Sequence, residues 1–181
     1  MPAPTSLIPS KATPALSLPL ASGGDWSLAD EGGDFTLLVF YRGYHCPKCK
    51  EQLLEIQDAD AGLKATGTNV VAISMDEQER AEKTQSEWEL DKLPVAYGLT
   101  AAQAREWGLW LSSSKGKTSI GVEELTIFNE PGIFLVRNDG TLHAAWVQTV
   151  PMARPKIEDI IAAITFFKEK GYPPRGIVED I

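Results

Sequence analysis

Two cysteines separated by two residues are the main chemical feature of this sequence. The 181-residue chain has no other cysteines, and both lie in the segment Cys46-Pro47-Lys48-Cys49. At the start of a helix, this spacing brings two sulfurs within bonding reach and points backbone N–H groups and the positive end of the helix dipole at the first sulfur. Thiolates in such settings have pKa values of about 3.5 to 7.5, against about 8.5 for a free cysteine. We therefore expect Cys46 to be a reactive thiolate at neutral pH.

The second cysteine has a different predicted role. Cys49 lies one turn further along the expected helix, where it can attack a sulfur adduct formed at Cys46 and release it as an internal disulfide. A peroxide would first convert Cys46 to a sulfenic acid, whereas a disulfide substrate would form a mixed disulfide with it. Lys48 adds positive charge nearby. His45 either stabilises the thiolate or shuttles a proton, or it is a solvent-facing side chain without a role.

Two other interpretations of the cysteines remain open. They could be small apolar side chains at the edge of a core. They could also bind metal, because a structural zinc site needs four protein ligands and the chain offers Cys46, Cys49, His45 and the distant His143. The non-enzymatic alternative is a metal-binding or copper-delivery module that uses the two cysteines and a histidine. A complete site needs His143 to fold back or to come from a second subunit, so we expect no metal and no cofactor.

The segments around the motif predict an α/β fold. An unbroken apolar run over 35–41 ends just before the cysteines and indicates a strand buried on both faces. A helical pattern follows and places Cys49 on one face with Leu53 and Ile56. Strand and helix patterns then alternate at 70–75, 76–90, 93–97 and 100–107. In the last of these, Thr100 and Gln103 have the spacing of a capping box. This alternation is typical of an α/β protein.

The remaining segments complete a single domain over 1–181. The turn Asn138-Asp139-Gly140 between apolar runs predicts an antiparallel hairpin, and a stripe of isoleucines after Pro155 predicts a final helix. The segment 112–130 is too long for a simple connection and is interpreted as an insertion or lid. Proline-rich residues 1–13 predict an extended arm, and the leucines and Trp26 that follow predict a small hairpin capping the core.

Composition excludes several classes of partner. The formal net charge is -8 and the pI is about 4.8, the wrong sign for binding a phosphate backbone. No apolar run approaches the roughly 20 residues needed to cross a bilayer. The first residues lack the basic and apolar regions of a secretory signal. We therefore expect a cytoplasmic protein that binds neither nucleic acid nor membranes.

Three segments resemble the alkyl hydroperoxide reductase/thiol-specific antioxidant (AhpC/TSA) family, the peroxiredoxin-like redoxins of the thioredoxin-like superfamily. The most specific is Val39-Phe40-Tyr41-Arg42-Gly43-Tyr44-His45-Cys46-Pro47-Lys48-Cys49. The second joins 93–98 to 104–109, similar to a strand and helix that end in an aromatic-Gly-aliphatic unit. The third is 131–140, similar to the family's proline, strand and Asp-Gly turn. Together with the N-terminal hairpin and the final helix they cover most of residues 14–170, and their order agrees with the strand and helix pattern above.

The resemblance implies a thioredoxin-like fold with a central mixed sheet flanked by helices and an N-terminal hairpin extension. It makes Pro131 a cis-proline facing the cysteines, with Gly132 facing the substrate. Peroxiredoxins generally carry Thr or Ser three residues before the attacking cysteine and Pro seven before it, where this chain has Gly43 and Val39. Arg42 would then supply the polar contact to a peroxide, or it forms a salt bridge at the end of the strand.

The resemblance also implies the reaction partners. The substrate is a small-molecule peroxide or a disulfide, and an external thiol reductant, such as a thioredoxin- or glutaredoxin-like protein, recycles the Cys46–Cys49 disulfide. Members of this branch are often dimers. A homodimer and a monomer are both compatible with the sequence.

Overall fold

A five-stranded mixed sheet forms the centre of the computed structural model, which describes residues 7–179. Its strand order is β5-β4-β3-β8-β9, with β3, β4 and β5 parallel and β8 antiparallel to both β3 and β9. The strands of this sheet are β3 (Phe35–Phe40), β4 (Thr68–Ile73), β5 (Val95–Ala96), β8 (Gly132–Arg137) and β9 (Leu142–Val147). This arrangement confirms the predicted mixed α/β sheet, with the predicted hairpin formed by β8 and β9.

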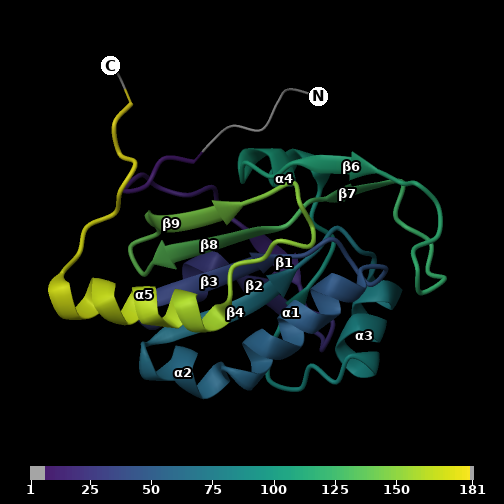
Figure 1. Cartoon of the computed structure of the whole chain (residues 1–181), viewed down its shortest axis with the longest axis horizontal. Coiled ribbons are helices and arrows are strands. Elements are labelled where there is room, and N and C mark those ends of the chain that lie inside the picture. Colours follow the sequence, from purple (N-terminus) through teal and green to yellow (C-terminus); the bar gives the residue numbers. More distant parts are fainter. Residues whose placement is uncertain (1–6, 180–181) are drawn as a thin grey trace.

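Helices cover one face of the sheet and a more varied layer covers the other (Figure 1). The helices are α1 (Pro47–Asp58), α2 (Asp60–Ala65), α3 (Gln78–Glu87), α4 (Ala101–Glu106) and α5 (Ile157–Lys170). Helices α1, α2, α3 and α5 share one apolar core with the sheet, and α4 shares the other with the N-terminal hairpin. The sheet is therefore buried on both faces.

Strand β3 is the central strand of the sheet, and every residue in it is buried. Leu37 and Val39 face the core on the α1 side, while Leu38 and Phe40 face the opposite core. The alternation explains why the sequence of this strand is apolar without interruption. The strand ends directly before the cysteine loop, so the loop has a rigid base.

Local signals set the helix ends. Cys46 is the N-cap residue of α1 and Pro47 is its first residue. Proline is tolerated there because the N–H of the first helical residue makes no hydrogen bond within the helix. Thr100 and Gln103 form the predicted capping box at the start of α4. Gly171 ends α5 in the left-handed conformation, with φ of 58°.

The N-terminal hairpin is present as predicted. Strands β1 (Ser17–Pro19) and β2 (Asp25–Ser27) pair antiparallel, with Leu18 opposite Trp26, and the 3₁₀ helix η1 (Leu28–Asp30) follows. Residues 1–6 of the predicted arm lie outside the described residues. The rest of the arm is bonded to the sheet, since the Ser10 N–H donates to the Leu142 carbonyl at 2.8 Å.

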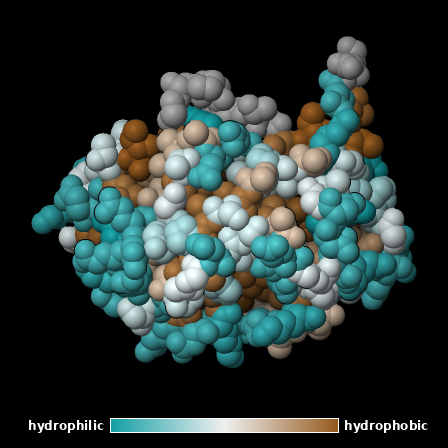
Figure 2. Space-filling view, turned by 180° about the vertical axis from the view of Figure 1, so that it is seen from behind, coloured by the Kyte–Doolittle hydropathy of each residue, from teal (hydrophilic) through white to brown (hydrophobic). Residues whose placement is uncertain are grey.

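The segment 112–130 contains a second small hairpin. Strands β6 (Leu111–Ser113) and β7 (Ile127–Asn129) pair antiparallel, and the long loop between them projects at the edge of the molecule (Figure 1). A space-filling view from behind shows hydrophilic side chains around most of the margin and hydrophobic ones interspersed with them (Figure 2). Within residues 7–179, no helix is long and apolar enough to cross a membrane.

Candidate active site

The two cysteines lie where β3 gives way to α1. The Cys49 N–H donates to the Cys46 carbonyl at 3.0 Å, and the Cys46 N–H donates to the Gly43 carbonyl at 3.0 Å. Both thiols are free, and both are buried, with exposed fractions of 2% for Cys46 and 0% for Cys49. The strand end and the helix start therefore fix both sulfurs beneath the surface.

Their surroundings give the two thiols opposite acidities. The pKa of Cys46 is lowered to about 6, mainly because the Cys49 side chain donates a hydrogen bond to it. Burial opposes this shift, whereas the Cys49 backbone N–H and the charges of Arg154 and Arg42 add to it. Burial, together with the neighbouring Cys46, raises the pKa of Cys49 well above its usual value. The pair thus consists of one acidic thiol and one thiol that holds its proton, which is the asymmetry expected of an attacking and a resolving cysteine.

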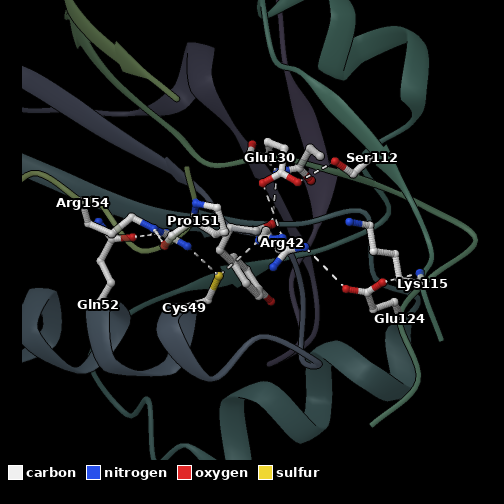
Figure 3. Close-up of polar contacts among 11 residues, drawn as sticks. Arg42, Cys49, Gln52, Ser112, Lys115, Glu124, Glu130, Pro151 and Arg154 are labelled. Carbon is white, nitrogen blue, oxygen red and sulfur yellow. Dashed lines mark hydrogen bonds and ion pairs between the residues drawn. The ribbon is translucent and has the colours of Figure 1, made fainter. Parts of the chain in front are cut away.

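Arg154 is a site residue that the sequence analysis missed. Its guanidinium Nη2 donates to Cys49 Sγ at 3.4 Å, and its Nη1 donates to Gln52 Oε1 at 2.6 Å (Figure 3). Its Nε donates to the Pro151 carbonyl at 2.6 Å. The Arg42 backbone N–H reaches the same sulfur at 3.4 Å. Arg154 lies between β9 and α5, more than 100 residues from the cysteines, and no local pattern in the sequence marks it.

The Arg42 side chain lies in an acidic setting. Its Nη2 is 3.4 Å from Glu124 Oε1 and its Nε is 3.5 Å from Glu130 Oε2 (Figure 3). The guanidinium carbon also lies over the Phe128 ring, 4.7 Å from the ring centroid. Glu130 also accepts a hydrogen bond from Ser112 Oγ at 2.6 Å. Arg42 therefore connects the cysteine loop to the β6–β7 hairpin, and its charge is paired rather than free.

A buried carboxylate, Asp76, lies against Gly43 and holds the loop before the cysteines. Asp76 accepts a hydrogen bond from the Tyr44 N–H at 2.7 Å and one from Arg80 Nε at 2.8 Å. Gly43 has a φ of +126°, and a Cβ there would lie 2.9 Å from both Asp76 oxygens. The position must therefore be glycine, because the carboxylate that holds the loop occupies the space of a side chain.

His45 is fully buried rather than solvent-facing, and this corrects one of the two sequence interpretations. Arg80 Nη2 lies 3.3 Å from its Nδ1, and its ring meets Phe128 edge-on with centroids 4.8 Å apart. Burial and the adjacent Arg42 and Arg80 lower the pKa of His45 to about 4. It is uncharged at neutral pH and does not supply a positive charge to the thiolate.

The structure contradicts the expectation that Pro131 is a cis-proline, because no peptide bond within residues 7–179 is cis. The chain runs extended from β7 into β8, with the Glu130 N–H donating to the Trp110 carbonyl and the Gln148 N–H donating to the Pro131 carbonyl. A Cβ on Gly132 would lie 2.4 Å from Leu109, in the core on the sheet face opposite the cysteines. Packing thus accounts for Gly132, and this placement does not support a substrate-facing role.

Two further predicted residues lie away from the sulfurs. Lys48 forms an ion pair with Glu51 on the exposed side of α1. His143 lies in β9, where it accepts a hydrogen bond from Arg137 Nε at 3.0 Å and packs against Phe35, at the far end of β3 from the cysteines. In the described part of the chain, no three His, Cys, Asp or Glu side chains form a group that could hold a metal. The metal-delivery alternative therefore has no support.

Comparisons with known proteins agree with this geometry. A model of the AhpC/TSA family matches residues 9–145. A relative from Mycobacterium tuberculosis (strain H37Rv), whose name places it among the peroxiredoxins, is 31% identical over 146 residues, covering 78% of this chain and 85% of the relative. Peroxiredoxin Bcp of Escherichia coli (strain K12) is 28% identical over 130 residues, covering 71% of this chain and 78% of that protein.

A solved structure supports the fold. The crystal structure of peroxidoxin BcpB from Mycobacterium tuberculosis superposes with a TM-score of 0.70 at 15% identity, over 88% of this chain and 97% of that chain. At this identity the likeness concerns the fold alone, and it confirms the thioredoxin-like fold that the sequence predicted.

Proposed function

Since this chain belongs to the AhpC/TSA family, we propose that it is a thiol peroxidase in which Cys46 attacks a hydroperoxide and Cys49 resolves the product. The observation that carries the proposal is the placement of two free, buried thiols at the start of α1, with Cys46 at the N-cap and Cys49 within the first turn. At pH 7 a Cys46 pKa of about 6 keeps most of this thiol ionised. The nucleophilic thiolate is therefore already formed in the substrate-free protein.

The first step oxidises Cys46. The thiolate sulfur attacks the terminal oxygen of the hydroperoxide, an S–O bond forms and the O–O bond breaks. The leaving alkoxide or hydroxide takes a proton and departs as an alcohol or water. Cys46 becomes a sulfenic acid, and the peroxide has gained two electrons.

The second step forms the internal disulfide. Cys49, as a thiolate, attacks the sulfenic sulfur of Cys46, the S–S bond forms, and the sulfenic oxygen leaves as water after protonation. An external thiol reductant then returns two electrons to the disulfide. A thioredoxin- or glutaredoxin-like protein is the expected class of reductant, and the loop from Gly43 to Cys46 must open to admit it.

Burial favours a small substrate. Only 2% of Cys46 is exposed, so a hydroperoxide reaches the sulfur with less rearrangement than a disulfide carried on a folded protein. Arg42 is the candidate donor to the peroxide oxygens. Glu124 and Glu130 hold its guanidinium through Nη2 and Nε.

Reduction of disulfides is the second candidate function. It is favoured by the Cys-x-x-Cys spacing at a helix start and by Gly43, which leaves the site without the hydroxyl of a peroxidase pocket. In that case Cys46 would attack a substrate sulfur and form a mixed disulfide, which Cys49 would break. The chemistry of the two cysteines is otherwise the same.

Rapid mixing of the fully reduced protein separates the two functions. Tryptophan fluorescence and trapped thiols are followed after addition of hydrogen peroxide, an organic hydroperoxide or a model disulfide in separate runs. The proposal expects fast loss of both thiols with a hydroperoxide, abolished in Cys46→Ser. Fast reaction with the disulfide alone would instead establish a thiol-disulfide oxidoreductase.

A further inference from the structure

We propose that Arg154 is a catalytic residue for the resolving cysteine: it stabilises the thiolate form of Cys49, both when Cys49 attacks and when it leaves. The inference deepens the proposed function and rests on the two-cysteine cycle described above. Its basis is the contact of 3.4 Å between the Arg154 guanidinium and Cys49 Sγ. The Cys46-Pro47-Lys48-Cys49 motif does not itself place a charged side chain at the Cys49 sulfur, since Lys48 pairs with Glu51 on the exposed side of α1.

The need for this charge follows from burial. Cys49 is 0% exposed, and a thiolate without compensation is costly in such a place. The resolving step nevertheless requires the thiolate, because a thiol is a poor nucleophile. Among residues 7–179, Arg154 is the cationic side chain that donates to this sulfur, and the neutral Arg42 N–H is the second donor.

The guanidinium is held in place before the reaction begins. Its Nη1 and Nε donate to Gln52 Oε1 and to the Pro151 carbonyl, each at 2.6 Å, which leaves Nη2 directed at the sulfur. Gln52 is on α1, one turn beyond Cys49, so the same helix carries the sulfur and one anchor of the arginine (Figure 3). A charge-assisted hydrogen bond from a positioned donor is among the stronger ones in proteins.

The same contact selects the direction of reduction. A reductant thiolate can attack either sulfur of the oxidised pair. Attack on Cys46 forms a mixed disulfide at Cys46 and expels Cys49 as a thiolate beside Arg154, and a second reductant thiol then displaces the reductant from Cys46. Two electrons pass from two reductant thiols to the pair, and Cys49 takes a proton from solvent. Burial of Cys49 and the charge at its sulfur both direct the first attack to Cys46.

The test compares Arg154→Met with Arg154→Lys and with Arg137→Met as a matched control. Arg137 also donates to a neighbouring side chain, His143, but lies at the far end of the sheet. Each reduced variant is mixed with a hydroperoxide over a range of pH, and two readouts are taken. One is the rate at which Cys46 is oxidised, and the other is the rate at which the sulfenic acid disappears, with a sulfenic-specific trap as the probe.

We expect Arg154→Met to slow the second rate by about tenfold to a hundredfold, the effect of losing a hydrogen bond to a charged group. The dependence of that rate on pH should move to higher pH, and sulfinic acid should accumulate at Cys46 at lower peroxide concentrations. Arg154→Lys should recover part of the rate, and Arg137→Met should behave as the native protein. An unchanged rate and pH profile in Arg154→Met would overturn the proposal.

A second measurement separates this proposal from the proposed function. In Cys46→Ser protein, the Cys49 thiolate is titrated by its ultraviolet absorbance with and without Arg154→Met. This equilibrium measurement needs neither a peroxide nor any step of the reaction. The proposal expects the Cys49 pKa to rise when the arginine is removed, and an unchanged pKa would overturn it. If the reduced native protein does not react with hydroperoxides, the proposed function is wrong. This titration and the rate at which dithiothreitol reduces the Cys46–Cys49 disulfide still decide the role of Arg154.

Discussion

Replacement of Gly43 by alanine should destabilise the protein far more than a surface glycine substitution does. The new Cβ would lie 2.9 Å from both carboxylate oxygens of Asp76 and 3.1 Å from its Cγ. It would also hold a side chain at a φ of +126°, which costs about 1 to 2 kcal/mol. Asp76 is fully buried and cannot move away without losing contacts.

The magnitude follows from those contacts. Asp76 accepts hydrogen bonds from the Tyr44 N–H and Arg80 Nε at 2.7 and 2.8 Å, and losing one such bond to a charged acceptor costs about 1.5 to 3 kcal/mol. Together with the backbone cost, Gly43→Ala should lower the free energy of unfolding by about 3 to 5 kcal/mol. Gly43→Thr, which restores the residue that peroxiredoxins usually carry here, should be at least as destabilising.

Gly98→Ala is the matched control. Gly98 also has a positive φ, of +77°, but a Cβ there meets nothing within 4 Å, so only the backbone cost of about 1 to 2 kcal/mol applies. Urea unfolding followed by tryptophan fluorescence measures both variants. If Gly43→Ala is no more destabilising than Gly98→Ala, then the carboxylate does not hold the loop as described.

Three further predictions follow from the site. Alkylation of Cys46 should accelerate as the pH rises through about 6 and then level off, and a midpoint above 8 would contradict its lowered pKa. Because the folded-state pKa of His45 is lowered to about 4, the unfolded chain binds more protons between about pH 4 and 6.5, and stability should fall as the pH decreases through this window. His45→Phe should reduce that slope in urea titrations at several pH values, while the part due to His143, whose pKa burial also lowers to about 4, remains. Arg42→Met leaves two nearly buried carboxylates unpaired and should cost about 2 to 3 kcal/mol, while Glu124→Gln in the same background should recover part of the loss in a double-mutant cycle.

Most of the fold could be predicted because its signals are local. The unbroken run that forms β3, the Asp-Gly turn between β8 and β9 and the capping box at Thr100 each specify one element within a few residues. Strand β5 is shorter than the predicted range 93–97, since Pro94 cannot donate a ladder hydrogen bond. The hairpin within 112–130 was not predicted, because its two short strands are separated by a long loop of mixed composition.

The candidate site was predicted only where chemistry and sequence proximity coincide. Only two residues separate Cys46 from Cys49, and both lie at the start of α1, so their roles could be inferred from spacing. Arg154 meets Cys49 only because the chain returns between β9 and α5, and Asp76 reaches the loop from the end of β4. Such contacts depend on tertiary structure, which also buries His45.

The most direct test of the account is the site of oxidation after one equivalent of hydroperoxide is added to the reduced native protein. Peptide mapping by mass spectrometry locates the oxidised sulfurs and the mass they gain or lose. The account predicts a disulfide between Cys46 and Cys49 of the same chain, which makes that chain lighter by two hydrogen atoms. Cys49→Ser should instead give a sulfenic or sulfinic acid at Cys46. A native product that carries oxygen on Cys46 while Cys49 stays a free thiol would contradict the central claim.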